Sequence, residues 1–216
     1  MIPVLDEQLI KEHLKLLPVQ NCKQISLWQA PLVFDFWEAW EAKVGCECEI
    51  PYWAIIWPAG RVMATYILNH PELVAKKTVL DFGSGSGVTG IAAARAKAAS
   101  VIVNDIDPVA LDMAQKNSLL NNVSITTEQR DLTALSEYCG AEIIIVAEMF
   151  YLQSHSPVIL SYIQNARRQG IEVYIADGSR TYTPRTDITL IHEEVVSVDK
   201  EVEGKAERTV RILKLN

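Results

Sequence analysis

The pattern of apolar and polar positions changes character part-way along the chain. In the first part, helical spacing predicts helices over Leu5–Leu17, which Pro18 ends, and over Arg61–Asn69. Between them, Ile25–Phe34 predicts one or two short strands, and an aromatic-rich stretch follows. This part has no regular alternation of strand and helix.

From Thr78 onward, strands alternate with helices. Strands are predicted over Thr78–Phe82, Val101–Asp105, Ser124–Thr127, Ile143–Glu148 and Glu172–Asp177. Helices are predicted between them, over Thr89–Ala98, Pro108–Asn121, Leu132–Tyr138 and Ser156–Gln169. This alternation predicts an α/β fold, with a parallel sheet covered by helices on both faces.

The last two apolar runs depart from that alternation. Asp187–Val198 and Glu207–Leu215 are both strand-like, and only DKEVEGKAE, with no predicted helix, lies between them. Two strands joined in this way predict a hairpin. We therefore expect the parallel sheet to end in an antiparallel C-terminal hairpin.

Composition narrows the class of protein. The chain has 216 residues, 49% of them hydrophobic, which suits one domain with a proper core and a small N-terminal extension. The net charge of −7 argues against a nucleic-acid partner, which needs a basic surface. The four histidines are scattered, without metal-ligand spacing, so we expect no metal site.

Location is predicted from what the sequence lacks. The longest apolar runs are far shorter than the roughly 20 residues that span a bilayer, so we expect no membrane contact. Four cysteines are too few for a disulfide scaffold, and the N-terminus has neither a signal-peptide nor a transit-peptide pattern. These features predict a cytoplasmic protein.

A glycine-rich loop directly follows the first strand of the alternating part. In VLDFGSGSGVTG, residues 79–90, Gly85, Gly87 and Gly90 have the G-x-G-x-x-G spacing of a nucleotide-binding turn. Asp81 stands at the strand end, where its carboxylate would repel a dinucleotide pyrophosphate and attract an ammonium or sulfonium group. S-adenosylmethionine (SAM) carries both cations and no phosphate. The loop therefore favours SAM over NAD.

Acidic residues also follow the next two strands. Asp105 lies about 20 residues beyond the loop, where an acid can hold both ribose hydroxyls, a feature shared by NAD and SAM sites. Asp107, before Pro108, suits either a helix N-cap or a ligand contact. Asp131 is placed either to accept from an adenine amino group or to lie solvated in a loop.

Two of these segments carry a resemblance. VLDFGSGSGVTGIAAA and VNDIDPVALDMAQKNSLLNNV resemble the class I, seven-strand, SAM-dependent methyltransferases. PYWAIIWPAGRVMATYILNHP, EMFY and VYIADGSR are similar to the branch that contains the lysine methyltransferases of the electron transfer flavoprotein β-subunit and the ribosomal-protein methyltransferases. The resemblance covers roughly residues 51–180 and implies a Rossmann-like, doubly wound, seven-strand sheet with an antiparallel end.

The resemblance also implies a division of the chain and a cofactor site. Residues 1–57 would form an N-terminal helix, short strands and a possible lid, and residues 58–216 the SAM-binding domain. The predicted cofactor site consists of Trp57, Asp81, Gly83, Ser84, Gly85, Gly87, Asp105, Ile106, Asp131 and Leu132.

The predicted catalytic residues are Glu148 and Tyr151. By resemblance, the motif after the fourth alternating strand begins with an acid and ends with an aromatic residue, here Glu148 to Tyr151. Glu148 would orient the acceptor amine or take its proton. An aromatic slot would favour a neutral lysine amine, with side chains from Tyr52, Trp53, Phe150 and Tyr151 as candidates.

The acceptor remains open at this point. The branch commonly has Asp at the first motif position and another acid after the tyrosine, whereas this chain has Glu148 and Leu152. We therefore expect a protein lysine as the acceptor, with a small-molecule amine or metabolite as the alternative. An NAD-dependent oxidoreductase and a non-catalytic SAM-binding module are the further alternatives.

Overall fold

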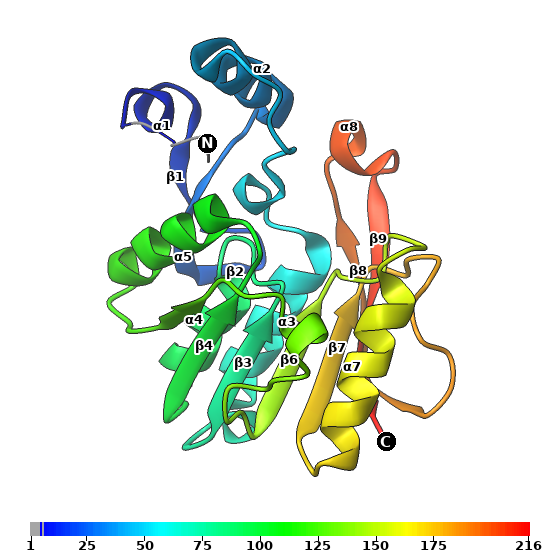
Figure 1. The fold of residues 1–216 in the computed structure, drawn as a ribbon. Coiled ribbons are helices and arrows are strands. Elements are labelled where there is room, and N and C mark those ends of the chain that lie inside the picture. Colours follow the sequence, from blue (N-terminus) through cyan, green and yellow to red (C-terminus); the bar gives the residue numbers. More distant parts are fainter. Residues whose placement is uncertain (1–4, 6) are drawn as a thin grey trace.

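A seven-stranded sheet forms the centre of the molecule (Figure 1). The computed structural model describes residues 5 and 7–216. The strand order is β5-β4-β3-β6-β7-β9-β8. The strands are β3 (Thr78–Phe82), β4 (Ser100–Asn104), β5 (Thr126–Glu128), β6 (Ile143–Ala147), β7 (Glu172–Asp177), β8 (Ile188–Ser197) and β9 (Glu207–Leu215).

The direction of the strands confirms the predicted α/β class. β5, β4, β3, β6 and β7 are parallel to one another, whereas β9 is antiparallel to both β7 and β8. The prediction that no helix lies in the terminal hairpin is wrong, because α8 (Lys200–Glu203) forms there. Asp199 caps this turn by accepting from the Glu201 N–H at 2.8 Å, and Gly204 ends it in a left-handed conformation.

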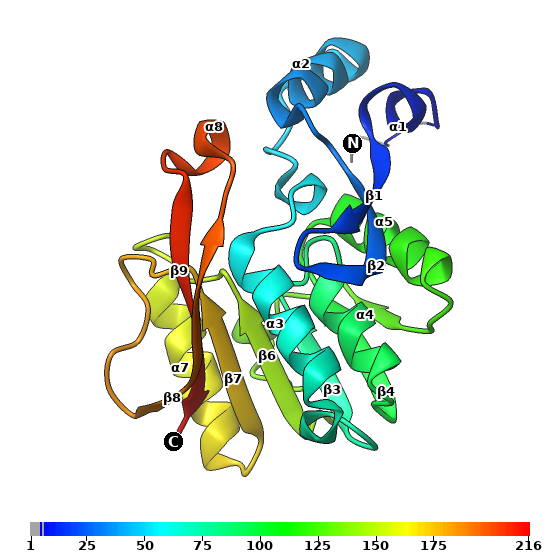
Figure 2. The ribbon, with the colours of Figure 1, turned by 180° about the vertical axis from the view of Figure 1, so that it is seen from behind.

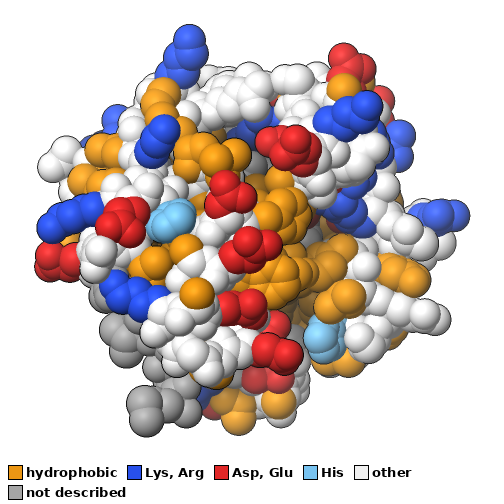
Figure 3. Space-filling view, turned by 90° about the horizontal axis from the view of Figure 1, so that it is seen from above, with side chains coloured by type: hydrophobic (Ala, Val, Ile, Leu, Met, Phe, Trp, Pro, Cys, Tyr) orange, Lys and Arg blue, Asp and Glu red, His pale blue; other side chains and the backbone are white. Residues whose placement is uncertain are grey.

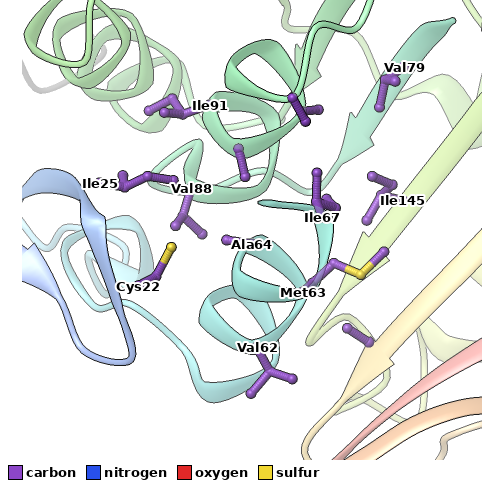
Figure 4. Close-up of a cluster of buried hydrophobic side chains, with 14 of the residues drawn as sticks. Cys22, Ile25, Val62, Met63, Ala64, Ile67, Val79, Val88, Ile91 and Ile145 are labelled. Carbon is purple, nitrogen blue, oxygen red and sulfur yellow. The ribbon is translucent and has the colours of Figure 1, made fainter. Parts of the chain in front are cut away.

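Helices cover both faces of the sheet. One face carries α3 (Pro58–Asn69), α4 (Val88–Arg95) and α5 (Pro108–Leu120), and the other carries α7 (Ser156–Arg168) with the short α6 (Leu132–Leu135). Figure 2 shows α3 and α4 in front of the sheet, and Figure 1 shows α7 in front from the opposite side. Each face buries a core of its own, and Figure 4 shows α3 side chains such as Met63 packed toward Val79 and Ile145 of the sheet.

Several predicted elements of this part have different ends in the structure, and two short ones differ most in position or length. The helix predicted over Leu132–Tyr138 ends at Leu135, since Ser136 takes a left-handed conformation with φ 54°. The strand predicted over Ser124–Thr127 lies instead at Thr126–Glu128, where it pairs with β4. Both errors concern short edge elements, whose ends depend on their neighbours.

The N-terminal part forms a small unit above the carboxyl ends of the strands (Figure 1). It contains α1 (Glu7–His13), β1 (Lys15–Val19), β2 (Cys22–Gln29), α2 (Val33–Val44) and the 3-10 turn η1 (Tyr52–Ala54). The single helix predicted over Leu5–Leu17 is therefore wrong: it ends at His13, and β1 begins at Lys15. Antiparallel pairing of β1 with β2 overrides the helical spacing of the leucines there.

Asn117 of α5 and Asn121, which caps the C-terminus of that helix, attach this unit to the sheet domain. Asn117 accepts from the Trp28 N–H at 2.9 Å through Oδ1 and donates to the Ser86 carbonyl at 3.0 Å through Nδ2. Asn121 accepts from the Ser26 N–H at 3.2 Å and donates to the Ser26 carbonyl at 2.7 Å. The two side-chain amides thus hydrogen-bond to the free backbone groups along the edge of β2, as a neighbouring strand would. Through Ser86, Asn117 also connects β2 to the glycine loop.

Candidate active site

The candidate site lies where the strand order reverses. β4 and β5 extend the sheet on one side of β3, and the chain then returns to place β6 on the other side. The loops after β3 and β6 therefore run in opposite directions, which opens a crevice at the carboxyl ends of these two strands. The glycine loop follows β3 and Glu148 follows β6, so both lie at this point.

The glycine loop is a tight turn held to the neighbouring strand. Ser84 donates its N–H to the Asn104 carbonyl at 2.9 Å, and Gly87 donates its N–H to the Ser84 carbonyl at 2.8 Å. Gly83 has φ 67°, and a Cβ built there would meet the flexible end of the Met149 side chain. Gly87 has φ 78°, and its Cβ would lie 2.9 Å from that of Ala114. Backbone conformation favours glycine at both positions, and close packing requires it at Gly87 as well.

Asp105 and Ser84 are the residues that best fit a nucleoside ligand. Asp105 accepts from the Gly85 N–H at 2.9 Å and from the Asp107 N–H at 3.0 Å, one bond to each carboxylate oxygen. Each oxygen keeps further acceptor capacity, which suits a ribose diol. The Ser84 hydroxyl is buried and has no hydrogen-bond partner among the described residues. A buried hydroxyl without a partner is costly, and a group bound in this crevice would supply one.

Asp81 lies deeper than its sequence position suggests. It is 1% exposed and accepts from the Gly90 N–H at 2.7 Å, in the first turn of α4. Burial raises the pKa of this carboxyl to about 7, against the lowering effect of the Gly90 hydrogen bond. The structure therefore gives Asp81 a helix-terminal role, and direct contact with a cofactor stays a prediction.

The remaining predicted cofactor residues differ in placement. Asp131 caps α6 by accepting from the Thr133 N–H at 3.0 Å, and the Thr133 hydroxyl lowers its pKa. Leu132 is fully buried in the core beneath α6 and α7, whereas Ile106 is 71% exposed after β4. Asp107 is the N-cap of α5 and accepts from the Val109 N–H at 2.8 Å. Cofactor contacts by Asp131, Leu132 and Ile106 stay predictions.

Glu148 is buried and fully engaged. Its carboxylate accepts from the Ala59 N–H at 2.9 Å, from Arg180 Nε at 2.5 Å and from the Gly178 N–H at 3.3 Å. Its backbone has φ 59°, which is uncommon for a residue with a side chain and is typical of strained positions at functional sites. Burial raises the pKa of Glu148, while the Arg180 charge opposes that rise.

Arg180 continues this interaction into the terminal hairpin, and the sequence analysis missed its role. Its guanidinium pairs with Glu148 and also with Glu203 at 2.9 Å, and Glu203 in turn pairs with Arg208. Arg180 also lies 5.6 Å from the centre of the Trp57 ring. Arg180 is the last residue of VYIADGSR, but the sequence alone gives no reason to pair it with Glu203.

Three aromatic residues gather beside Glu148. The ring centres of Tyr52 and Trp57 are 5.9 Å apart, and those of Tyr52 and Tyr151 are 6.2 Å apart. Tyr52 and Tyr151 are both 44% exposed, so this cluster is open to solvent. The proposed slot residues Phe150 and Trp53 are instead core residues, at 1% and 2% exposure, because Phe150 packs beneath α7 and Trp53 against Phe36.

The described part of the chain contains no cluster of histidine, cysteine or carboxylate side chains that would hold a metal ion. Among the described residues, no helix is both long enough and apolar enough to cross a membrane. Figure 3 shows the face above the strand ends: apolar side chains occupy a hollow, with acidic side chains along one side of it.

Known proteins resemble this chain in sequence and in fold. The zebrafish (Danio rerio) electron transfer flavoprotein β subunit lysine methyltransferase is 38% identical over 131 residues, which are 60% of this chain and 51% of that protein. The ribosomal protein L11 methyltransferase of Dichelobacter nodosus is 33% identical over 57% of this chain and 45% of its own length. The chain thus spans about half the length of the curated relatives it matches.

The fold is shared with a solved structure of a proposed RNA methyltransferase from Pyrococcus horikoshii. The two agree with a TM-score of 0.53 and 18% identity, over 72% of this chain and 81% of that one. The family model described as lysine methyltransferase matches residues 35–194, most of the sheet and the aromatic segment before it. The chain belongs to the lysine methyltransferase family.

Proposed function

We propose that this protein transfers a methyl group from SAM to the side-chain amine of a lysine in another protein. One observation carries the proposal. The glycine loop and Asp105, with the unpartnered Ser84 hydroxyl beside them, lie at the same sheet switch point as the exposed Tyr52 and Tyr151. A nucleoside cradle beside an open aromatic cluster suits methyl transfer from SAM to an amine on a protein surface.

The cofactor side of the site is formed by the loop after β3 and the end of β4. Asp105 would accept from the ribose hydroxyls, and Ser84 would donate its buried hydroxyl to the cofactor. Trp57 would border the same pocket. SAM supplies the methyl group on an activated sulfonium, and the protein contributes position and exclusion of water.

The lysine amine must be neutral when it attacks, because a protonated amine has no free electron pair for the methyl group. Loss of water disfavours the charged form of lysine, and an acceptor protein docked over Tyr52 and Tyr151 would exclude water from its amine. The two rings would also hold the methylated ammonium by cation–π attraction. Glu148 is already engaged by Ala59, Gly178 and Arg180. That arrangement favours a positioning role, in which Glu148 fixes the start of α3 and the loop before Tyr151, over proton removal.

The acceptor class follows from exposure and from the relatives. Because Tyr52 and Tyr151 are each 44% exposed, the cluster suits a lysine on a protein surface better than an enclosed small amine. The curated relatives named for the electron transfer flavoprotein β subunit make that subunit the first acceptor to try. The net charge of −7 disfavours RNA, and the sparse cysteines support a cytoplasmic location.

The test is methyl transfer in vitro. Purified protein is incubated with tritiated SAM and the electron transfer flavoprotein β subunit, and the product is digested to identify the modified amino acid. We expect methyl-lysine. Asp105→Ala should lose cofactor binding, while Glu148→Ala should keep cofactor binding and lose transfer. Transfer at the wild-type rate by Glu148→Ala would contradict its proposed role, and label on RNA or on a small amine alone would contradict the acceptor.

A further inference from the structure

A second groove lies between the N-terminal unit and the terminal hairpin, outside the cofactor cradle. It encloses about 240 Å³ and is lined by the start of α2, residues 54–56, Pro58, Arg61 and the α8 turn. That volume is below the roughly 300–1,000 Å³ of typical small-molecule pockets, so the groove suits inserted side chains better than a whole metabolite. Neither the cofactor loop nor Glu148 lines it.

The groove exposes large apolar side chains. Leu32 is 63% exposed and Phe34 is 47% exposed, both at the start of α2. Ile55 and Ile56 line the same groove, together with Val202 of α8. Apolar side chains that gather in a hollow mark a docking surface more often than scattered ones do.

The charges around these apolar side chains have one sign. Asp35, Asp199 and Glu201 are exposed acids that line the groove. Among the described residues that line it, the one basic side chain is Arg61, and that side chain is 4% exposed. A cationic segment with apolar side chains therefore matches both the charge and the surface.

The walls of the groove are joined beneath it. The Arg61 guanidinium donates both to Gln20 in the β1–β2 turn and to the Ser197 carbonyl at the end of β8. Gln20 also donates to the Ser197 hydroxyl at 2.9 Å. Across the groove, Arg180 and Arg208 hold Glu203 of α8. A groove with such tied walls is preformed, which lowers the entropic cost of docking a segment.

The groove is also continuous with the acceptor side of the site. Ile55, Ile56 and Pro58 form part of its wall. Trp57, which lies between them in the chain but does not line the groove, contacts Tyr52 of the aromatic cluster. Arg180 contacts Trp57 on one side and Glu203, which lines the groove, on the other. When an acceptor protein places its lysine at the aromatic cluster, the residues next to that lysine would lie over this groove.

We propose that this groove docks a basic, apolar segment of the protein whose lysine is methylated. This inference rests on the proposed function for its choice of partner. Leu32 and Phe34 would contact the apolar side chains of the segment, and Asp35 and Glu201 would pair with its lysine or arginine side chains.

The test begins with binding, which needs no catalysis. A fluorescent peptide of about twelve residues, alternating leucine and lysine, is titrated into the protein in the presence of S-adenosylhomocysteine, and its anisotropy is followed. Asp35→Lys and Glu201→Lys should each weaken binding about three- to tenfold, and Phe34→Ser at least as much. The matched control is Glu72→Lys, an exposed acid at the opposite end of the sheet, which should bind the peptide as the wild type does.

Peptide controls and self-association complete the binding test. Peptides that alternate leucine with glutamate, or serine with lysine, should bind about tenfold more weakly than the leucine–lysine peptide. Equal binding of all three peptides, or unchanged binding by Asp35→Lys and Glu201→Lys, would overturn the proposal. So would a wild-type dimer in sedimentation that Phe34→Ser dissociates, because the groove would then hold a second copy of this chain.

A transfer assay separates this inference from the proposed function. With the electron transfer flavoprotein β subunit as acceptor, Asp35→Lys and Glu201→Lys should raise KM about three- to tenfold and leave kcat unchanged. Transfer with an unchanged KM in both variants would overturn the docking groove and leave the function standing. Groove-dependent peptide binding without any methyl transfer would support the groove and contradict the function.

Discussion

The cofactor side and the acceptor side of this site are built in opposite ways. The cofactor side is local: Asp81, the glycine loop and Asp105 lie within 25 consecutive residues, residues 81–105, and connect mainly to one another's backbone. The acceptor side joins distant segments through Glu148, Arg180 and Glu203, with Tyr52 and Trp57 from the N-terminal part. One side depends on backbone geometry and the other on side-chain ion pairs between elements.

This difference predicts which substitutions affect the whole fold and which affect ligand binding alone. Removal of one partner from a buried ion pair lowers the stability of the fold strongly, because the other charge stays buried without a partner. A polar group that lies ready for a ligand contributes little to the empty protein. Substitutions of the first kind should therefore have the larger effects on stability.

The largest effect is expected for Arg180→Ala. It leaves the buried Glu148 carboxylate without its cationic partner and removes one of the two partners of Glu203, so unfolding should become easier by about 3–5 kcal/mol. Urea denaturation measures this, and Arg185→Ala, an exposed arginine in the same loop, is the control. A loss equal to that of the control would mean that the network does not hold the hairpin.

Asn117→Ala should have the next largest effect. It removes the acceptor of the part-buried Trp28 N–H and the donor to the buried Ser86 carbonyl, at a cost of about 2–4 kcal/mol. The same denaturation experiment applies, with Lys116→Ala on the exposed side of α5 as the control. Limited proteolysis should then cut first in the N-terminal unit, and an unchanged cleavage pattern would argue against this docking contact.

Asp81→Asn should change the pH dependence of stability. Burial raises the pKa of this carboxyl to about 7, so the folded state holds a proton that the unfolded state releases above about pH 4. Wild-type stability should therefore fall as the pH rises from 5 to 8, by about 2–3 kcal/mol from this group. The variant lacks that fall. Parallel pH profiles for the two proteins would show that Asp81 is ionised in the fold throughout.

Ser84→Ala should have the smallest effect on the empty protein. A buried hydroxyl without a partner costs free energy, so its removal should leave the stability unchanged or raise it by about 1 kcal/mol. Affinity for S-adenosylhomocysteine should fall about three- to tenfold, because the ligand loses a donor. Unchanged affinity, measured by calorimetry, would mean that Ser84 does not contact the cofactor.

How much the sequence could predict follows the same division. The strands Thr78–Phe82 and Glu172–Asp177 have the predicted bounds, since buried apolar runs bounded by turn residues are a local signal. The helix predicted over Leu5–Leu17 is wrong because its second half forms a hairpin with β2, and that hairpin is held by the distant residues Asn117 and Asn121. The pairing of Arg180 with Glu203, and the core positions of Phe150 and Trp53, depend on the fold in the same way.

The most direct test of the central claim is a calorimetric titration of the purified protein with S-adenosylhomocysteine, with NADH in a parallel experiment. The account predicts micromolar binding of S-adenosylhomocysteine that Asp105→Ala removes, and no binding of NADH. Binding of NADH alone would contradict the assignment of the glycine loop to SAM, and binding of neither would contradict the assignment of this protein as an active methyltransferase.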